Sequence, residues 1–165
     1  MTATHVHLFL NHVPILATLF GLGLLLYAAF RRSDEVARVA LGFFVVAALV
    51  AVPVYLTGGR AEEAVEELPG VTEAVIEPHE EAGEIALWSS AALGVLALGT
   101  LVATRRRERL PRWAVPVALG LSALVGGWFV YTGSLGGTIR HTEIRASAQT
   151  SAPAPDARAE DADGD

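Results

Sequence analysis

The side chains of this 165-residue sequence that are best suited to chemistry are its five histidines, His5, His7, His12, His79 and His141. Neutral imidazole is a common ligand of transition metals and a usual axial ligand of haem b. Cysteine is absent, which excludes thiolate metal sites, iron–sulfur clusters, disulfides and haem attached through CxxCH. The histidines occur in three separate segments, and His12, His79 and His141 are the main candidate ligands, with His5 and His7 as additional ones.

Carboxylates and arginines near these histidines extend the candidate site. Glu80, Glu84 and Glu143 are the nearest acidic side chains. Three histidines with a glutamate suit a zinc, copper or non-haem iron ion, whereas two facing histidines on different helices suit haem b. Arg140 and Arg145 are placed to hold haem propionates or to pair with the glutamates.

Four long apolar runs must position this site, at about 7–30, 36–57, 85–104 and 113–132. Each reaches the ~20 residues that a helix needs to cross the hydrocarbon core. Backbone groups inside lipid must hydrogen-bond within their own segment, so the runs are predicted to be helices. We therefore expect an all-α fold: an integral membrane antiparallel four-helix bundle formed by residues 1–145.

Small residues four positions apart predict close contacts between these helices. Ala17–Gly21, Ser90–Gly94, Gly99–Ala103 and Ser122–Gly126 follow this pattern. No charged residue lies in the middle of a span, which argues against a proton pump or an ion-coupled transporter.

Arginines are concentrated in the first and third connections between the runs. These are Arg31, Arg32, Arg38, Arg105, Arg106, Arg107, Arg109 and Arg112. Short loops rich in arginine stay on the cytoplasmic side. We therefore expect a multi-pass protein of the bacterial inner membrane with both termini outside, which puts all five histidines on the outer side, near the membrane surface.

The second connection, 58–84, contains nine glutamates between Glu62 and Glu84. Residues 61–68 predict a short amphipathic helix, and the glycine pairs at 58–59 and 136–137 predict the exits of two long helices. Pro78 is expected at the first position of the third long helix.

The acidic segment 146–165 is rich in Ala, Pro and Asp without periodicity, so it is predicted to be a disordered tail.

Several short stretches resemble a known group of sequences. "HVHLFLNHVPI", "YLTGG", "PHEEAG" and "GGTIRHTEI" are similar to patches of a family of uncharacterised four-helix bacterial membrane proteins with a His-Phe-Pro-like opening and a Gly-Gly…Arg-His close. The resemblance implies a four-helix fold and a histidine pattern similar to that of small b-type cytochromes. By position it transfers His12, His79 and His141, although this chain has Asn11-His12-Val13-Pro14 where the family more often has His-Phe-Pro.

Three functions follow as hypotheses. The first is binding of haem b or a transition-metal ion for electron transfer, with a soluble or membrane redox partner. The second is a non-catalytic membrane subunit or assembly partner whose acidic connection at 60–84 docks a soluble protein, and the third is a redox-inactive zinc or copper module. A homo-oligomer or a place in a larger complex fits each of these hypotheses. No basic arm suggests nucleic acid, and no HExxH, GxSxG or phosphate-loop motif identifies an enzyme.

Overall fold

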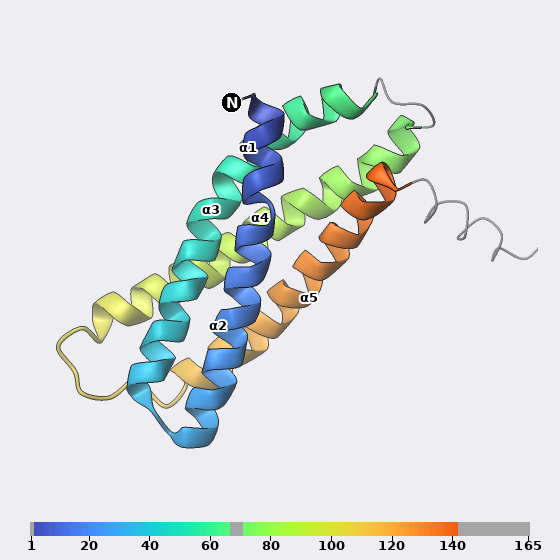
Figure 1. Cartoon of the computed structure of the whole chain (residues 1–165). Helices are drawn as coiled ribbons and strands as arrows, with labels where there is room; N and C mark the ends of the chain where they lie inside the picture. Colours follow the sequence, from blue (N-terminus) through green and yellow to red (C-terminus); the bar gives the residue numbers. More distant parts are fainter. Residues whose placement is uncertain (1, 67–70, 142–165) are drawn as a thin grey trace, which may run out of the picture.

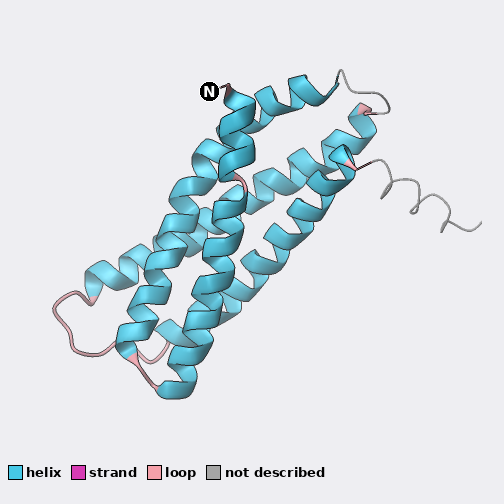
Figure 2. Cartoon of the chain, in the orientation of Figure 1, coloured by secondary structure: helices cyan, strands magenta, loops and turns pink. Residues whose placement is uncertain are grey.

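The computed structural model describes residues 2–66 and 71–141, and these residues form helices and connections without a strand (Figures 1 and 2). The helices are α1 (Ala3–Leu10), α2 (His12–Arg31), α3 (Asp34–Glu66), α4 (Glu73–Ala103) and α5 (Ala114–Arg140). Asn11 alone separates α1 from α2. Pro14 explains this interruption, because it lacks the amide that would bond the carbonyl of Leu10.

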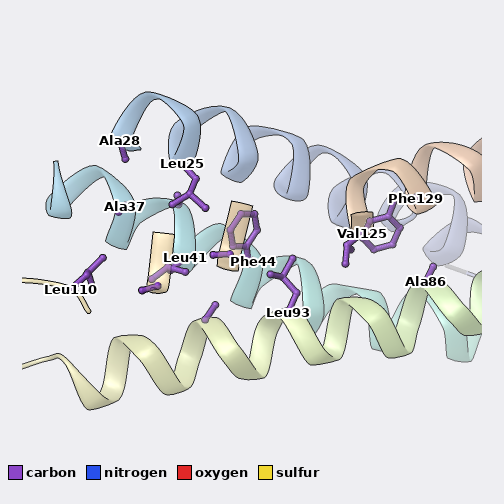
Figure 3. Packing of buried hydrophobic residues seen from close by; sticks show 14 residues of the cluster. Leu25, Ala28, Ala37, Leu41, Phe44, Ala86, Leu93, Leu110, Val125 and Phe129 are labelled. Atoms are coloured by element: carbon purple, nitrogen blue, oxygen red, sulfur yellow. The ribbon is translucent and has the colours of Figure 1, made fainter. Parts of the chain in front are cut away.

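The four long helices pack around one core in a bundle-like arrangement. Helix α2 contacts α3 and α5, and α4 contacts the same two helices. Leu25, Leu41, Phe44 and Leu93 are almost fully buried between them (Figure 3). The N-terminus, the end of α3, the start of α4 and the end of α5 lie at one end of the molecule, called here the histidine end (Figure 1). The α2–α3 turn and the α4–α5 loop lie at the other, called the arginine end.

Small residues bring the helices into close contact, as the sequence predicts. A Cβ atom at Gly21 would lie 2.5 Å from the ring of Phe44, and one at Gly94 would collide with the Cβ of Ala48. These glycines set the α2–α3 and α3–α4 spacing. Gly99 differs, because a Cβ there would meet no atom within 4 Å.

The outer surface of the helices is strongly apolar. Within the described residues, four helical stretches are long and apolar enough to cross a membrane, and only 28–33% of each apolar window is buried. Leu49, Val95 and Leu124 are among the large side chains that remain exposed. A soluble monomer rarely exposes so much continuous apolar surface, so this composition indicates a membrane protein.

The predicted helix ends at the glycine pairs are wrong. Gly58-Gly59 lies inside α3, which continues to Glu66 without a separate short helix, and Gly136-Gly137 lies inside α5. Pro78 is also inside a helix, since α4 begins at Glu73. The glycines serve packing rather than termination, because histidine rings lie against two of them, as described below.

Candidate functional site at the histidine end

His7 on α1 is held across a helix interface by its Nδ1 atom. This nitrogen lies 2.9 Å from the carbonyl oxygen of Val54 on α3. The hydroxyl of Thr57 donates to the same carbonyl at 3.1 Å and to that of Pro53 at 2.7 Å. One turn after Val54, a Cβ at Gly58 would lie 3.8 Å from the Cε1 of His7, an ordinary contact distance.

His79 on α4 is held in the same way by α5. Its Nδ1 lies 3.0 Å from the carbonyl oxygen of Thr132. One turn after Thr132, a Cβ at Gly136 would lie only 3.0 Å from the Cε1 of His79. The ring therefore occupies space that a larger residue at position 136 would need.

Further hydrogen bonds hold α4 and α5 in register beside His79. The indole Nε1 of Trp128 donates to the carbonyl of Ala82 at 2.9 Å, and the hydroxyl of Thr132 points to the same carbonyl at 3.3 Å. Thr132 is buried, so its backbone carbonyl is a fixed acceptor for the imidazole. The position of His79 is thus determined by three contacts between two rigid helices.

His7 and His79 lie in similar surroundings, and we call each of these surroundings, a backbone carbonyl and a nearby glycine, a histidine seat. In each seat an imidazole Nδ1 meets a carbonyl on another helix, and that carbonyl residue is followed four and five positions later by Gly-Gly. Val54 precedes Gly58-Gly59, and Thr132 precedes Gly136-Gly137. Both glycine pairs are inside helices rather than at the predicted helix exits. Their shared spacing is the signal that could have identified the two seats.

The partner of Nδ1 determines the chemistry of the other ring nitrogen. A carbonyl oxygen only accepts hydrogen bonds, so Nδ1 of His7 and of His79 must carry the proton. In the neutral ring the lone pair is then on Nε2. No hydrogen bond to either Nε2 occurs within residues 2–66 and 71–141. Metal-bound histidines commonly donate their other N–H to a backbone carbonyl in this manner.

His7 and His79 lie on helices that do not contact each other directly, since α1 packs on α2 and α3, and α4 packs on α3 and α5. His7 and His79 interact electrostatically, and Glu80 acts on His79 as well. Both histidines are half-buried, whereas Glu80 is exposed. The two imidazoles come from α1 and α4, which are far apart in the sequence.

The other predicted site residues lie in different surroundings. His12 is exposed at the start of α2, and the Nδ1 of exposed His5 lies 2.6 Å from the hydroxyl of Thr2. His141 follows α5, and its backbone N–H bonds the carbonyl of Gly137 at 3.0 Å. Arg140 and Glu84 are exposed, and Glu143 and Arg145 lie outside the described residues.

A three-ligand metal group is not found in the described part of the chain. No three or more histidines, aspartates or glutamates gather there closely enough to hold a metal ion. The set formed by His12, His79 and His141 with a glutamate therefore stays a prediction. Within the described residues, His7 and His79 are the imidazoles that a backbone carbonyl of another helix holds through Nδ1, so both are candidate ligands of a haem or a metal ion.

An acidic cavity of about 590 Å³ lies between the end of α3 and the start of α4. Glutamates dominate its lining, which consists of Glu62, Glu66, Val71, Thr72, Glu73, Glu77 and Glu80. Glu62 from α3 and Glu80 from α4 both contribute to this lining.

The described residues form a helical structure with four candidate membrane spans, and at one end backbone carbonyls of neighbouring helices hold His7 and His79. Comparison with family models, with curated proteins and with solved structures finds no match for this chain.

Proposed function

We propose that this chain is an integral membrane protein that binds haem b or a transition-metal ion at the histidine end, for electron transfer. The helices would form an antiparallel bundle in the bacterial cytoplasmic membrane, with both termini on the outer side. The arginine-rich connections support this orientation. The resemblance to four-helix bacterial membrane proteins with a cytochrome-like histidine pattern is consistent with it.

The observation that carries the proposal is the duplicated histidine seat. His7 and His79 each give Nδ1–H to a helix carbonyl, which leaves an Nε2 lone pair on each ring. Backbone carbonyls fix the ring orientation and raise the basicity of the free nitrogen. A bound haem or redox-active metal ion would supply one-electron chemistry, while the protein holds and orients its ligands.

Further ligands would come from the other candidate residues of the histidine end. His12 and His141 are at the same end, and Arg140 and Arg145 are candidates for haem propionates. A metal ion would need more donors than two imidazoles, and Glu80, Glu84 and Glu143 are the candidates.

The test is an absorption spectrum of the purified protein, oxidised and reduced, together with metal analysis. A Soret band whose position shifts on reduction supports haem. Stoichiometric copper or iron without a Soret band supports a redox metal site, and stoichiometric zinc supports the redox-inactive module. Protein expressed with haem precursor and metal supplements that carries none of these would contradict the proposal.

The acidic cavity favours a second candidate function, the docking of a soluble protein at the end of α3. Five glutamates line the cavity without a basic partner among its lining residues. Under this alternative, replacing Glu62, Glu63 and Glu66 with Gln should release a co-purifying partner. Replacing Glu35 and Glu108, which lie at the arginine end, is the control that should leave the partner bound.

A further inference from the structure

The arginine end contains a cavity of about 370 Å³ between the α2–α3 turn and the α4–α5 loop. Three arginines line it, Arg32, Arg109 and Arg112, and Asp34 is its only acidic lining residue. The three arginines outnumber the single aspartate, so the lining carries a net positive charge. We propose that this cavity binds the headgroup of an anionic phospholipid.

The walls of the cavity are preorganised by contacts with the bundle. The backbone N–H of Leu110 meets a carboxylate oxygen of Asp34 at 3.4 Å, and Leu110 is buried in the core. Arg38 donates to the hydroxyl of Thr104 at 3.0 Å and to the carbonyl of Arg107 at 2.9 Å. These bonds fix the α4–α5 loop against α3, so the cavity does not depend on a loose connection.

The guanidinium groups of the lining arginines are available to a ligand. Neither an ion pair nor a hydrogen bond engages the guanidinium groups of Arg32, Arg109 and Arg112 within the described ranges, in contrast to Arg38. A carboxylate oxygen of Asp34 already accepts a hydrogen bond from the backbone N–H of Leu110. Guanidinium groups form paired hydrogen bonds with phosphate oxygens, so a phosphate group matches the unused donors.

The backbone at Arg32 supports a specific role for its side chain. Arg32 has φ 53° and ψ 41°, and among the described residues it is the one non-glycine with positive φ. Glycine is favoured at such helix-ending positions, because it has no Cβ. An arginine kept in a strained conformation is a reason to look for a function of that side chain.

The apolar part of the cavity selects a lipid over free phosphate. Ala28, Ala29 and Val115 line it together with the arginines. Phe30 and Trp113 follow the lining residues Ala29 and Arg112 in the sequence, and their side chains are 84% and 50% exposed. The site therefore offers guanidinium groups to a phosphate and an apolar wall to the adjoining acyl chain. Basic cavities between the ends of membrane helices suit acidic lipid headgroups.

This proposal rests on the membrane insertion included in the proposed function and is independent of haem or metal binding. Native mass spectrometry of the full-length protein in detergent, titrated with phosphatidylglycerol and separately with phosphatidylcholine, tests it. The triple variant R32Q/R109Q/R112Q is compared with R105Q/R106Q/R107Q, which removes equal charge from the same end outside the cavity lining.

We expect wild type and the control variant to retain phosphatidylglycerol over phosphatidylcholine. The cavity variant should lose roughly fivefold in affinity per arginine. Equal loss in both triple variants would show attraction by net charge alone and overturn the proposal. Displacement of the lipid by equimolar glycerol phosphate would show a site for free phosphate and overturn it also.

A second variant protects the test against misfolding. R32G places glycine where the backbone favours it, so the turn should form at least as well as in wild type. We expect weaker phosphatidylglycerol binding with an unchanged or higher unfolding temperature. Wild-type lipid binding by R32G would remove Arg32 from the site. Failure of membrane insertion is recognised separately by membrane fractionation of the wild-type protein.

Discussion

The two ends of the molecule use different chemistry to join their helices. At the histidine end, imidazole side chains bond backbone carbonyls of a neighbouring helix, as His7 does with Val54 and His79 with Thr132. At the arginine end, Arg38 joins α3 to the α4–α5 loop with a charged group. The charge of the arginine-rich connections identifies one end from the sequence, whereas the packing role of the glycines at the other end is visible only in the structure.

The largest expected effect separates the paired histidines from the others. His7→Ala and His79→Ala should each reduce haem or metal affinity by more than about 100-fold, because each removes a ligand rather than an orienting neighbour. His5→Ala should leave affinity nearly unchanged, since His5 is exposed and bonds Thr2. Cofactor content per protein after purification measures this.

His12→Ala sharpens the same comparison. A large loss of cofactor in that variant, with His7→Ala near wild type, would show that His12 rather than His7 is the ligand. That result would contradict the proposed role of His7.

The next effect is on stability at the His79 seat. Gly136→Ala should destabilise the protein by about 1–3 kcal/mol, because its Cβ would press on the His79 ring. Gly137→Ala is the matched control, since a Cβ there meets nothing within 4 Å. Alanine favours the helix, so the control should be stabilised by up to about 1 kcal/mol. Thermal unfolding in detergent compares them, and equal shifts would show that position 136 is not constrained.

Arg38→Gln tests the corresponding contact at the arginine end. Loss of its hydrogen bonds to Thr104 and Arg107 should cost about 1–2 kcal/mol of unfolding free energy. Arg106→Gln removes the same charge from an exposed position and should change stability by less than about 0.5 kcal/mol. If both variants lose the same amount, the end is held by general charge rather than by the Arg38 contacts.

The smallest effect distinguishes the two histidine seats. Gly58→Ala should change the unfolding free energy by less than about 1 kcal/mol, in the stabilising direction, because a Cβ there would lie 3.8 Å from His7. The His7 seat is thus more spacious than the His79 seat. A loss as large as that of Gly136→Ala would make the seats equivalent.

The sequence predicts the four long helices well, because length and hydropathy alone define them. It also predicts the close contacts at Gly21 and Gly94. The helix ends are less predictable. Gly-Gly and Pro78 are ordinary signals of helix boundaries, and here tertiary packing outweighs that local preference.

The sequence also does not show which histidines contact the backbone carbonyls of another helix. His5, His7 and His12 lie within eight positions on one segment. The side that faces α3 depends on the rotation of α1 about its axis, which the interruption at Asn11 changes. His7 was therefore only an additional candidate, while the contact of His79 with Thr132 required knowledge of how α4 packs on α5.

The most direct test of the histidine pair is ¹⁵N NMR of ligand-free protein labelled at histidine nitrogens, at mildly alkaline pH, with His7→Ala and His79→Ala variants to assign the signals. We expect the neutral form of each ring to carry its proton on Nδ1 and to leave Nε2 unprotonated. Rings protonated on Nε2 in either residue would contradict this expectation.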